Sequence, residues 1–515
     1  FSCDRPQKSG MDFDSIDTDI YELDYTDGVI VTDVNADSYA DVLQSSFIAS
    51  PSTEKKKVWF NTGNFTTRNS VFILATSTYS IPNIAGTSNP VFVCTRPISS
   101  DPCDAEGVAV FSIRGDLANA FVRSPGPATT SSSVYMNTGS GWSHSSLWDE
   151  EVQEIDPLSN SRPLIADING DSLPDHIRAF DSGGNAFVVH RNTGLSMESI
   201  SISSETPDYF GLRMADMNHD GLNDVYRAYR TPAIGYDIGV FINTTIFEEG
   251  FVEDTEWVLP SNNLSNTFEN STNGITQALL ADLNGDDFPD FISDSQGLLY
   301  LNDGYNKSFT TTTFTFNAED NNGRRYVGDV NGDGLLDVIY NLCNSRYPNC
   351  ITFLYLNTGK IPDLLSQITL PTGGEINVAY KASPQYKSGN TLLNAKLPIT
   401  VQTVQAIGEY DSVMGVVGTT TYEYAGGSYY FNDPHDRKFA GFETVTQTRP
   451  DGSKRIDYFH QGNSSNSSNY EYQDFHPKIG KSFRTDSRDA GDNLMVLITN
   501  KIEEDVLSSE IFGDR

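Results

Sequence analysis

Short apolar, β-rich runs recur along the first two thirds of the chain, and polar loops rich in Asp and Asn separate them. Runs such as VIVTD, PLIAD and ALLAD precede the loops, and runs such as DVIY and DFIS follow them. Runs of this length and composition are typical of strands bounded by turns. The pattern predicts strand–loop–strand units and an all-β fold in this part of the chain.

The loops share one nine-residue pattern, found in five copies at residues 33–41, 167–175, 216–224, 282–290 and 329–337. Positions 1, 3, 5 and 9 are Asp, Asn, Asp and Asp in every copy. A single copy is explained equally well as an ordinary turn, because Asp and Asn both favour turns. Five copies with four fixed positions favour a metal-binding loop instead.

Calcium is the metal that this pattern predicts. It takes six to eight oxygen ligands in a flexible shell, and alternate side chains on a tight loop supply them, with the backbone carbonyl of position 7 as a further ligand. About five calcium ions are therefore expected. The predicted ligands are Asp33, Asn35, Asp37, Tyr39, Asp41, Asp167, Asn169, Asp171, Leu173, Asp175, Asp216, Asn218, Asp220, Leu222, Asp224, Asp282, Asn284, Asp286, Phe288, Asp290, Asp329, Asn331, Asp333, Leu335 and Asp337.

The EF-hand begins in the same way but requires an acidic ligand at position 12 and a helix on each side. Position 12 is never acidic in this chain, and the flanking runs are β-rich. The residues found there are Gln44, Arg178, Arg227, Ser293 and Tyr340. The EF-hand is therefore excluded.

A sixth, degenerate copy lies at residues 112–120, where Ser112, Arg114 and Ala120 replace three of the ligands. The guanidinium of Arg114 would supply a positive charge in place of calcium. The same residues spell Arg114-Gly115-Asp116, an integrin-ligand motif, but a metal-free loop is the preferred explanation. A short β-rich run with an Asn-based turn follows each of the six loops, ending at residues 63, 139, 194, 245, 304 and 359. Six loops and six closing turns predict six repeats.

Residues 26–360 resemble the FG-GAP/VCBS repeats of integrin-like β-propellers on these loops and closing turns. The resemblance implies four-stranded blades in which a calcium loop joins two strands. Six blades are expected, with seven as the alternative that the long stretch 64–110 would allow. The acidic N-terminal segment, within residues 1–25, is a candidate for the strand that closes the last blade.

Residues 361–515 change to alternating strands with Gly-rich turns, which predicts an antiparallel sheet. The order LPTGGEINVAYKAS, LPITVQTVQAIGEYD and TTTYEYAGGSYYFNDPHDRKFAGFETVTQTRPDGSKRIDYFHQG resembles the module after the propeller in SpvB-type proteins and in the B component of Tc insecticidal toxins. In that family the module begins an RHS-type β-shell that encloses a toxic cargo. No RHS repeat of the YD type follows it in these 515 residues.

The formal net charge of -35 argues against a nucleic-acid partner, which would need a basic footprint. Two close cysteine pairs, Cys94 with Cys103 and Cys343 with Cys350, predict local disulfides in an oxidising compartment, with reduced thiols as the alternative; Cys3 stands alone. Seven Asn-x-Ser/Thr sequons permit glycosylation, at Asn64, Asn243, Asn263, Asn270, Asn306, Asn463 and Asn466. No apolar run long enough for a transmembrane helix occurs.

No catalytic motif stands out: GxSxG, HExxH, GxGxxG and a Walker loop are all missing, and His435 and His460 are interpreted as structural residues. The chain is therefore predicted to be non-catalytic. The main hypothesis is a secreted or cell-surface, calcium-stabilised protein that docks a protein or glycan partner through its propeller. The alternative is the N-terminal part of a Tc/RHS-type toxin-delivery cocoon, which would assemble with other subunits.

Overall fold

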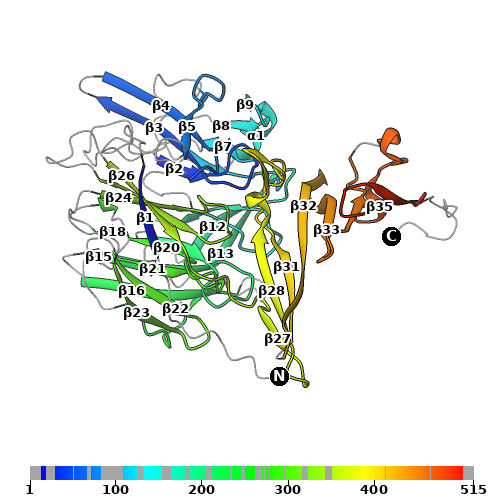
Figure 1. Ribbon diagram of the computed structural model, residues 1–515. Coiled ribbons are helices and arrows are strands. Elements are labelled where there is room, and N and C mark those ends of the chain that lie inside the picture. Colours follow the sequence, from blue (N-terminus) through cyan, green and yellow to red (C-terminus); the bar gives the residue numbers. More distant parts are fainter. Residues whose placement is uncertain are drawn as a thin grey trace, which may run out of the picture. The chain divides into compact units, whose positions relative to one another are not determined.

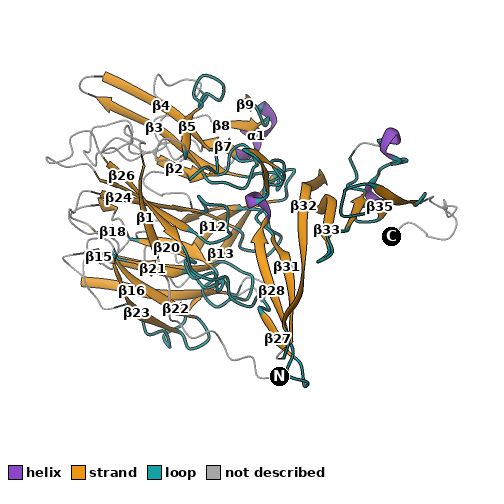
Figure 2. Cartoon of the chain, viewed as in Figure 1, coloured by secondary structure: helices purple, strands orange, loops and turns teal. Residues whose placement is uncertain are grey.

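A computed structural model shows a nearly all-β protein, as Figure 2 makes plain from the few short helices among many strands. The described residues are 13–18, 29–49, 52–65, 71–82, 108–123, 132–153, 164–179, 186–203, 211–231, 235–244, 250–260, 269–270, 274–275, 278–293, 297–315, 323–342, 351–411, 413–463 and 466–502. The chain divides into two compact units, one of Phe1–Asp363 with Asp433–His435 and one of Leu364–Asn432 with Asp436–Arg515. No helix in the described part of the chain is long and apolar enough to span a membrane.

The first unit is a six-bladed β-propeller, and its blades can be followed in Figure 1. Consecutive strands pair antiparallel within each blade. The first three blades are β2 (Val29–Thr32), β3 (Asp41–Ala49), β4 (Ser52–Asn61) and β5 (Phe72–Leu74); β6 (Val108–Phe111), β7 (Ala120–Arg123), β8 (Ser133–Asn137) and β9 (Trp142–His144); and β10 (Leu164–Ala166), β11 (Asp175–Ala179), β12 (Ala186–Asn192) and β13 (Met197–Ser203).

The other three blades follow the same plan. The fourth blade carries a short extra pair of strands, β18 and β19, beside β15. In the second blade, a helix, α1 (Ser146–Gln153), follows β9. These blades comprise β14 (Leu212–Ala215), β15 (Asp224–Thr231), β16 (Gly235–Asn243) and β17 (Phe251–Glu253), with β18 (Glu269–Asn270) and β19 (Gly274–Ile275); β20 (Leu279–Ala281), β21 (Asp290–Ile292), β22 (Leu298–Asp303) and β23 (Ser308–Thr315); and β24 (Gly323–Gly328), β25 (Asp337–Leu342) and β26 (Ile351–Asn357).

The N-terminal strand β1 (Phe13–Thr18) completes the sixth blade. It pairs antiparallel with β26, with Phe13 opposite Asn357 and Thr18 opposite Thr352. Residues from the start of the chain thereby join a sheet made from residues 323–357. Closing the ring with a strand from the other end of the propeller links its first and last blades.

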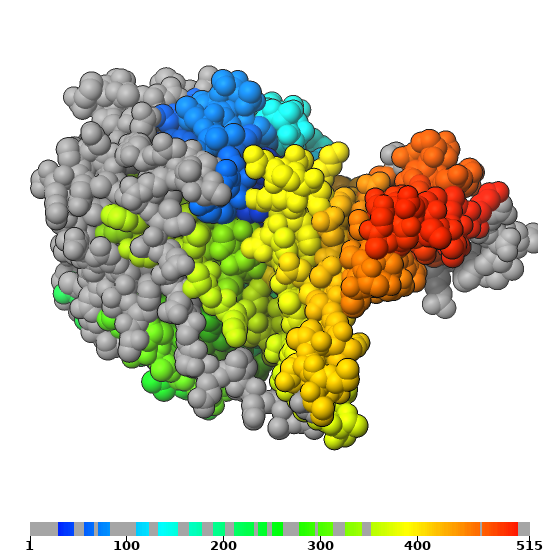
Figure 3. Space-filling model, in the orientation of Figure 1, coloured from blue at the N-terminus to red at the C-terminus, as the bar shows by residue number. Residues whose placement is uncertain are grey.

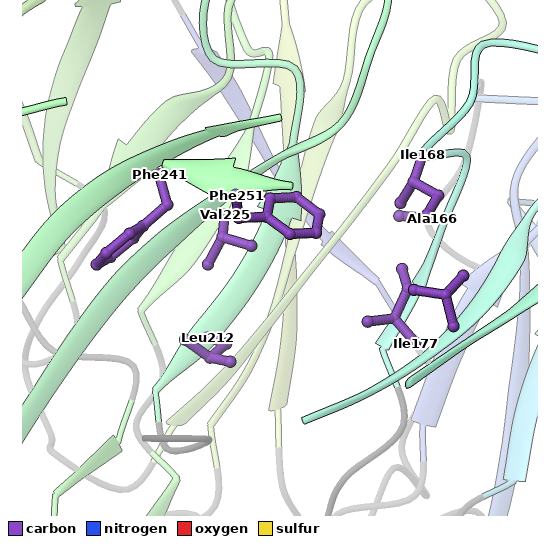
Figure 4. Packing of buried hydrophobic residues seen from close by; sticks show 8 residues of the cluster. Ala166, Ile168, Ile177, Leu212, Val225, Phe241 and Phe251 are labelled. Carbon is purple, nitrogen blue, oxygen red and sulfur yellow. The ribbon is translucent and has the colours of Figure 1, made fainter. Parts of the chain in front are cut away.

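Six apolar cores lie between successive blades and continue around the ring. Figure 4 shows the core between the third and fourth blades, where Ile177 and Val225 are fully buried. The core between the sixth and first blades includes Ile339 and Val42. Since apolar side chains removed from water supply most of the stabilisation of a fold, each blade is held mainly by its two neighbours.

The second unit is an open antiparallel sheet of eight strands with few buried side chains; Figure 3 shows it in yellow to red. Its long central strands run through the stretch whose sequence predicts alternation. In sheet order the strands are β27 (Gln367–Thr369), β28 (Glu375–Ala382), β31 (Gln402–Asp411), β32 (Gly415–Asp433), β33 (Asp436–Thr448), β34 (Lys454–Phe459), β35 (Ser482–Arg488) and β36 (Leu494–Thr499), and β29 (Lys387–Ser388) pairs with β30 (Thr391–Leu392) separately. Among the described residues of this unit, 3-10 turns lie at Ser383–Gln385, Ser467–Asn469 and His476–Lys478.

The predicted fold class is therefore confirmed: a six-bladed propeller and a separate antiparallel sheet. The predicted disulfides lie outside the described residues, as do all five cysteines. One sequon is not a usable acceptor in the folded protein. Asn243 is buried, and its side-chain amide donates to the carbonyl oxygens of Ile168 at 2.9 Å and Asn223 at 3.0 Å.

Candidate metal-binding loops

The five Asp/Asn loops occupy the same place in five of the six blades, between the first and second strands. In the first blade, for example, β2 ends at Thr32 and β3 begins at Asp41, so the loop is the turn between them. Residues at positions 4 and 6 of the loops adopt a positive φ, from 60° at His219 to 93° at Gly334. This left-handed backbone is strained for residues other than Gly, yet the first loop adopts it with Ala36 and Ser38.

The carboxylate at position 1 is bonded by the loop's own backbone. In the sixth blade, Asp329 Oδ1 accepts the N–H of Gly332 at 2.7 Å, and Oδ2 accepts the N–H of Gly334 at 2.9 Å. Asp33 is held in the same way by Ala36 at 2.7 Å and Ser38 at 2.8 Å. Burial raises the pKa of Asp33 despite these bonds, because it disfavours the charged carboxylate.

Positions 3 and 5 are linked to each other. Asn331 donates its side-chain N–H to Asp333 Oδ2 at 2.9 Å, and its Oδ1 accepts the backbone N–H of Asp333 at 2.8 Å. Asp333 Oδ1 then accepts the N–H of Leu335 at position 7. The side chain of Leu335 is buried and packs against position 4 of the preceding loop, where a Cβ on Gly285 would lie 2.8 Å from it.

The aspartate at position 9 is fully buried in all five loops: Asp41, Asp175, Asp224, Asp290 and Asp337. In the third blade, Asp175 Oδ2 accepts the N–H of Ile168 at 3.0 Å, and Oδ1 accepts the N–H of Asn192 at 2.7 Å. Position 9 therefore ties the loop to the residue that opens the blade's closing turn. Position 9 also has the strongest electrostatic perturbation of the loop.

The pKa of the position-9 aspartate is raised mainly by burial, and the nearby carboxylates of positions 1 and 5 raise it further. The pKa of Asp175 is raised to about 7 and that of Asp224 to about 8. The pKa values of Asp41, Asp290 and Asp337 are raised well above the ordinary value for the same reasons. Each loop thus gathers several carboxylates around a buried one, and a bound cation would offset their repulsion.

The donor chemistry of these loops fits calcium. Each offers carboxylate and amide oxygens with backbone carbonyls, the hard ligands that calcium takes, and none of the predicted side-chain ligands is nitrogen or sulfur. The structure brings the predicted ligands of each copy into one loop, as the sequence pattern implies. The carbonyls of Tyr39, Leu173, Leu222, Phe288 and Leu335 remain predictions as ligands, although their side chains are all buried.

The degenerate loop of the second blade is held by an ion pair and a hydrogen bond between its own side chains. The guanidinium of Arg114 contacts the carboxylate of Asp116, and Ser112 Oγ donates to Asp116 Oδ1 at 3.1 Å. Asn119 reaches the first blade, donating to the carbonyl of Asp33 at 2.8 Å. A side-chain cation is therefore paired with the surviving position-5 carboxylate.

A ring of asparagine side chains, which the sequence pattern predicts only as turn residues, connects the blades. In five of the six blades, the Asn that opens the closing turn donates its side-chain N–H to the carbonyl at position 2 of the preceding blade's loop; the side-chain amide of Asn302, in the fifth blade, makes no such bond. Five such bonds occur among the described residues: Asn61 to Val330 at 2.7 Å, Asn137 to Val34 at 2.9 Å, Asn192 to Ile113 at 2.7 Å, Asn243 to Ile168 at 2.9 Å and Asn357 to Leu283 at 2.5 Å. The presence of Asn in all six closing turns is the signal that points to this role.

Comparison with known proteins places the fold. Residues 300–460 match the family model described as the insecticide toxin TcdB middle/N-terminal region. That match covers the end of the propeller and most of the second unit's central strands. No curated protein sequence matches the chain significantly.

Solved structures of Tc toxins resemble the chain over nearly its whole length. A Tc holotoxin pore of Photorhabdus luminescens aligns with a TM-score of 0.60 at 14% identity, covering 94% of this chain and 23% of that one. The TcdB2-TccC3 crystal structure aligns with a TM-score of 0.55 at 14% identity, over 94% of this chain and 24% of the other. The chain thus spans about a quarter of the length of these proteins and has a Tc toxin-like β-propeller fold.

These comparisons change the order of the two functional hypotheses. They favour the hypothesis of a toxin-delivery component over that of a free-standing binding protein, and they give no support to a glycan partner.

Proposed function

We propose that this chain is the propeller and the beginning of the shell of a Tc/RHS-type toxin-delivery assembly. Its role would be structural: the propeller docks other subunits, and the second unit starts the sheet that encloses a cargo. We also propose that it acts outside the cell and has no catalytic activity. The alignment of both units with the Tc toxin structures supports the architecture, because it extends over 94% of the chain.

The observation that carries the proposal is the exposed apolar strand β36. Five consecutive side chains are 38–67% exposed: Leu494, Met495, Val496, Leu497 and Ile498. Among the described strands, β36 is the last of its sheet and pairs on one side only, with β35. Edge strands in soluble proteins are usually shortened, charged or covered, because an open edge recruits further strands. An apolar edge is suited to a sheet that continues into more chain.

A β-shell supplies the missing cover for such an edge, since each strand has a neighbour on both sides. The eight-stranded sheet also buries few of its own side chains, which is expected if its faces pack against further parts of a larger structure.

Calcium has a structural role in this proposal. Each of the five loops would hold one ion through the carboxylates and amide of positions 1, 3, 5 and 9 and the carbonyl of position 7. The ion would neutralise carboxylates that the fold buries and so fix the turn between two strands. Extracellular calcium modules bind with dissociation constants of about 10⁻⁴–10⁻³ M, which suits a permanent structural ion.

The experiment that tests the function is to sequence the reading frame on both sides of these residues and to determine the structure of its whole product. The proposal predicts that a further strand pairs with β36 and continues a closed shell. A product in which β36 stays exposed to solvent, or is covered by something other than a strand, would overturn the shell proposal and return the free-standing docking protein to first place.

A further inference from the structure

The second unit contains a buried cluster of one imidazole and two carboxylates that belongs to none of the calcium loops. It consists of His460, Glu471 and Asp474, whose ligand atoms all lie within 4.8 Å of one another. The side chain of His460 is 1% exposed, that of Glu471 9% and that of Asp474 0%. All three lie in the segment between β34 and β35.

The imidazole nitrogen Nδ1 of His460 points at both carboxylates without forming a well-aligned hydrogen bond to either. It lies 3.2 Å from Glu471 Oε1 and 3.2 Å from Asp474 Oδ1. The distances alone would class these contacts as ion pairs, but Nδ1 is a buried polar atom with no hydrogen-bond partner. A buried polar atom without a partner is unfavourable, so the arrangement favours a further group beside Nδ1.

Backbone contacts hold the three side chains in place. The N–H of His460 donates to the carbonyl of Lys481 at 3.1 Å, and the imidazole packs on the ring of Phe483 with centroids 5.0 Å apart. Asp474 accepts three backbone N–H groups, from Gln461 at 3.3 Å, Gly462 at 3.0 Å and Asn463 at 3.0 Å.

Glu471 is held by one of its two oxygens. Its Oε2 accepts the N–H of Asn466 at 3.1 Å, while Oε1 faces the imidazole. Metal ligands are typically oriented by hydrogen bonds of this kind to their outer atoms. The ammonium of Lys478, the buried cation nearby, is bonded to the carbonyl of Tyr472 at 2.9 Å and lies 4.5 Å from the ring centroid of Phe475.

Two of the three separations between ligand atoms, those from His460 Nδ1, fit a small divalent ion. Around a tetrahedral zinc with bonds of about 2.0–2.1 Å, neighbouring ligand atoms are separated by about 3.3 Å. The two separations of 3.2 Å at Nδ1 agree with this edge length. One imidazole nitrogen with two carboxylates suits zinc and similar transition metals, whereas calcium and magnesium prefer oxygen alone.

We propose that His460, Glu471 and Asp474 form a transition-metal site of the zinc class, with a fourth position for water or another ligand. Such an ion would tie together the start and the middle of the segment between β34 and β35. The inference does not depend on the toxin-delivery function or on the calcium loops, because it rests on residues of the second unit alone.

The test is to measure zinc binding to the whole chain with calcium present in excess, so that the loops are saturated, and to record the visible spectrum of the cobalt-substituted protein. The wild type is expected to bind about one zinc and to give the intense cobalt bands of a tetrahedral site. His460→Gln should lower the zinc affinity by at least about tenfold and remove those bands, whereas His435→Gln, at an exposed histidine, should change neither.

If His460→Gln fails to fold, measurements on the wild type alone still test the proposal. X-ray absorption of the zinc-loaded wild type should then show a single imidazole among light-atom ligands, and zinc should raise its melting temperature beyond the calcium effect. Absence of zinc binding in the wild type, or cobalt bands unchanged by His460→Gln, would overturn the proposal. The cluster would then be a metal-free triad that shares a proton.

Discussion

The side-chain amide of Asn61 in the first blade donates to the backbone carbonyl of Val330 in the sixth, at 2.7 Å. This bond crosses the seam at which the propeller closes. The same amide also donates to Ala40, and Asn61 Oδ1 accepts the N–H of Gly63. One buried side chain thus joins the closing turn of one blade to the Asp/Asn loops of two.

Replacing this side chain should weaken the seam. Asn61→Ala leaves the buried carbonyl of Val330 without its donor and the closing turn without its acceptor. A buried group left unpaired costs about 1–3 kcal/mol, and we expect a loss of that size in the free energy of unfolding. Urea denaturation measures the loss, and hydrogen exchange in β2 and β24 locates it.

The fifth blade offers a matched control. Asn302 occupies the same place, is equally buried and has neither side-chain amide atom hydrogen-bonded. Asn302→Ala should therefore cost clearly less than Asn61→Ala. Equal losses for the two variants would mean that the amide bond across the seam contributes nothing and that only the volume of the side chain matters.

The repeats made the propeller predictable, because a pattern that recurs five times fixes both the loop and its flanking strands. The ring of asparagine side chains that connects the blades, to which Asn61 belongs, was not predicted. Its acceptors lie in another blade, 269 residues away for Asn61 and Val330, and no local pattern shows which carbonyl a turn residue will meet. The buried cluster around His460 was missed for a different reason: its three residues lie in one loop, but their irregular spacing matches no metal-site pattern.

A buried carboxylate in the second unit gives another prediction. Asp486 is fully buried; it accepts two hydrogen bonds from Arg484 at 2.7 Å each and a third from Arg488 at 3.2 Å. Burial raises the pKa of Asp486, but the two guanidinium groups outweigh it and hold the pKa below the ordinary value. Asp486→Asn removes the negative charge that both arginines share, and a loss of about 1–3 kcal/mol is expected.

Asp492→Asn serves as the comparison. Asp492 is 56% exposed and pairs with Lys454 and Arg488 at the surface. Exposed ion pairs contribute about 0–1 kcal/mol, so the variant should unfold almost as the wild type does. Amide exchange in β34 and β35 is the readout; a similar loss of protection in the two variants would disprove the role given to Asp486.

The pH dependence of stability without calcium follows from the buried loop aspartates. Asp175 and Asp224 have folded pKa values of about 7 and about 8, against an ordinary value of 3.8 for an aspartate in water. The folded protein therefore holds these protons more tightly than the unfolded chain does. Their stabilisation is complete below about pH 4 and is lost as the pH rises through 7 and 8.

We accordingly expect the calcium-free protein to be less stable at pH 8 than at pH 5, and calcium to reverse most of that loss because it binds the ionised carboxylates. Urea midpoints with EDTA and with calcium at the two pH values measure this. Asp224→Asn removes one titrating group and should flatten the calcium-free slope. A calcium-free protein that gains stability between pH 5 and pH 8 would contradict the pKa shifts.

Calcium content is the most direct test of the central claim that five blades carry a structural ion and the second blade does not. Equilibrium dialysis with elemental analysis should give about five calcium ions per chain, and EDTA should lower the melting temperature. Asp333→Ala, in the loop of the sixth blade, should remove one ion, whereas Asp116→Ala, in the loop held by Arg114, should remove none. A chain that binds no calcium and melts at the same temperature with and without EDTA would contradict the account.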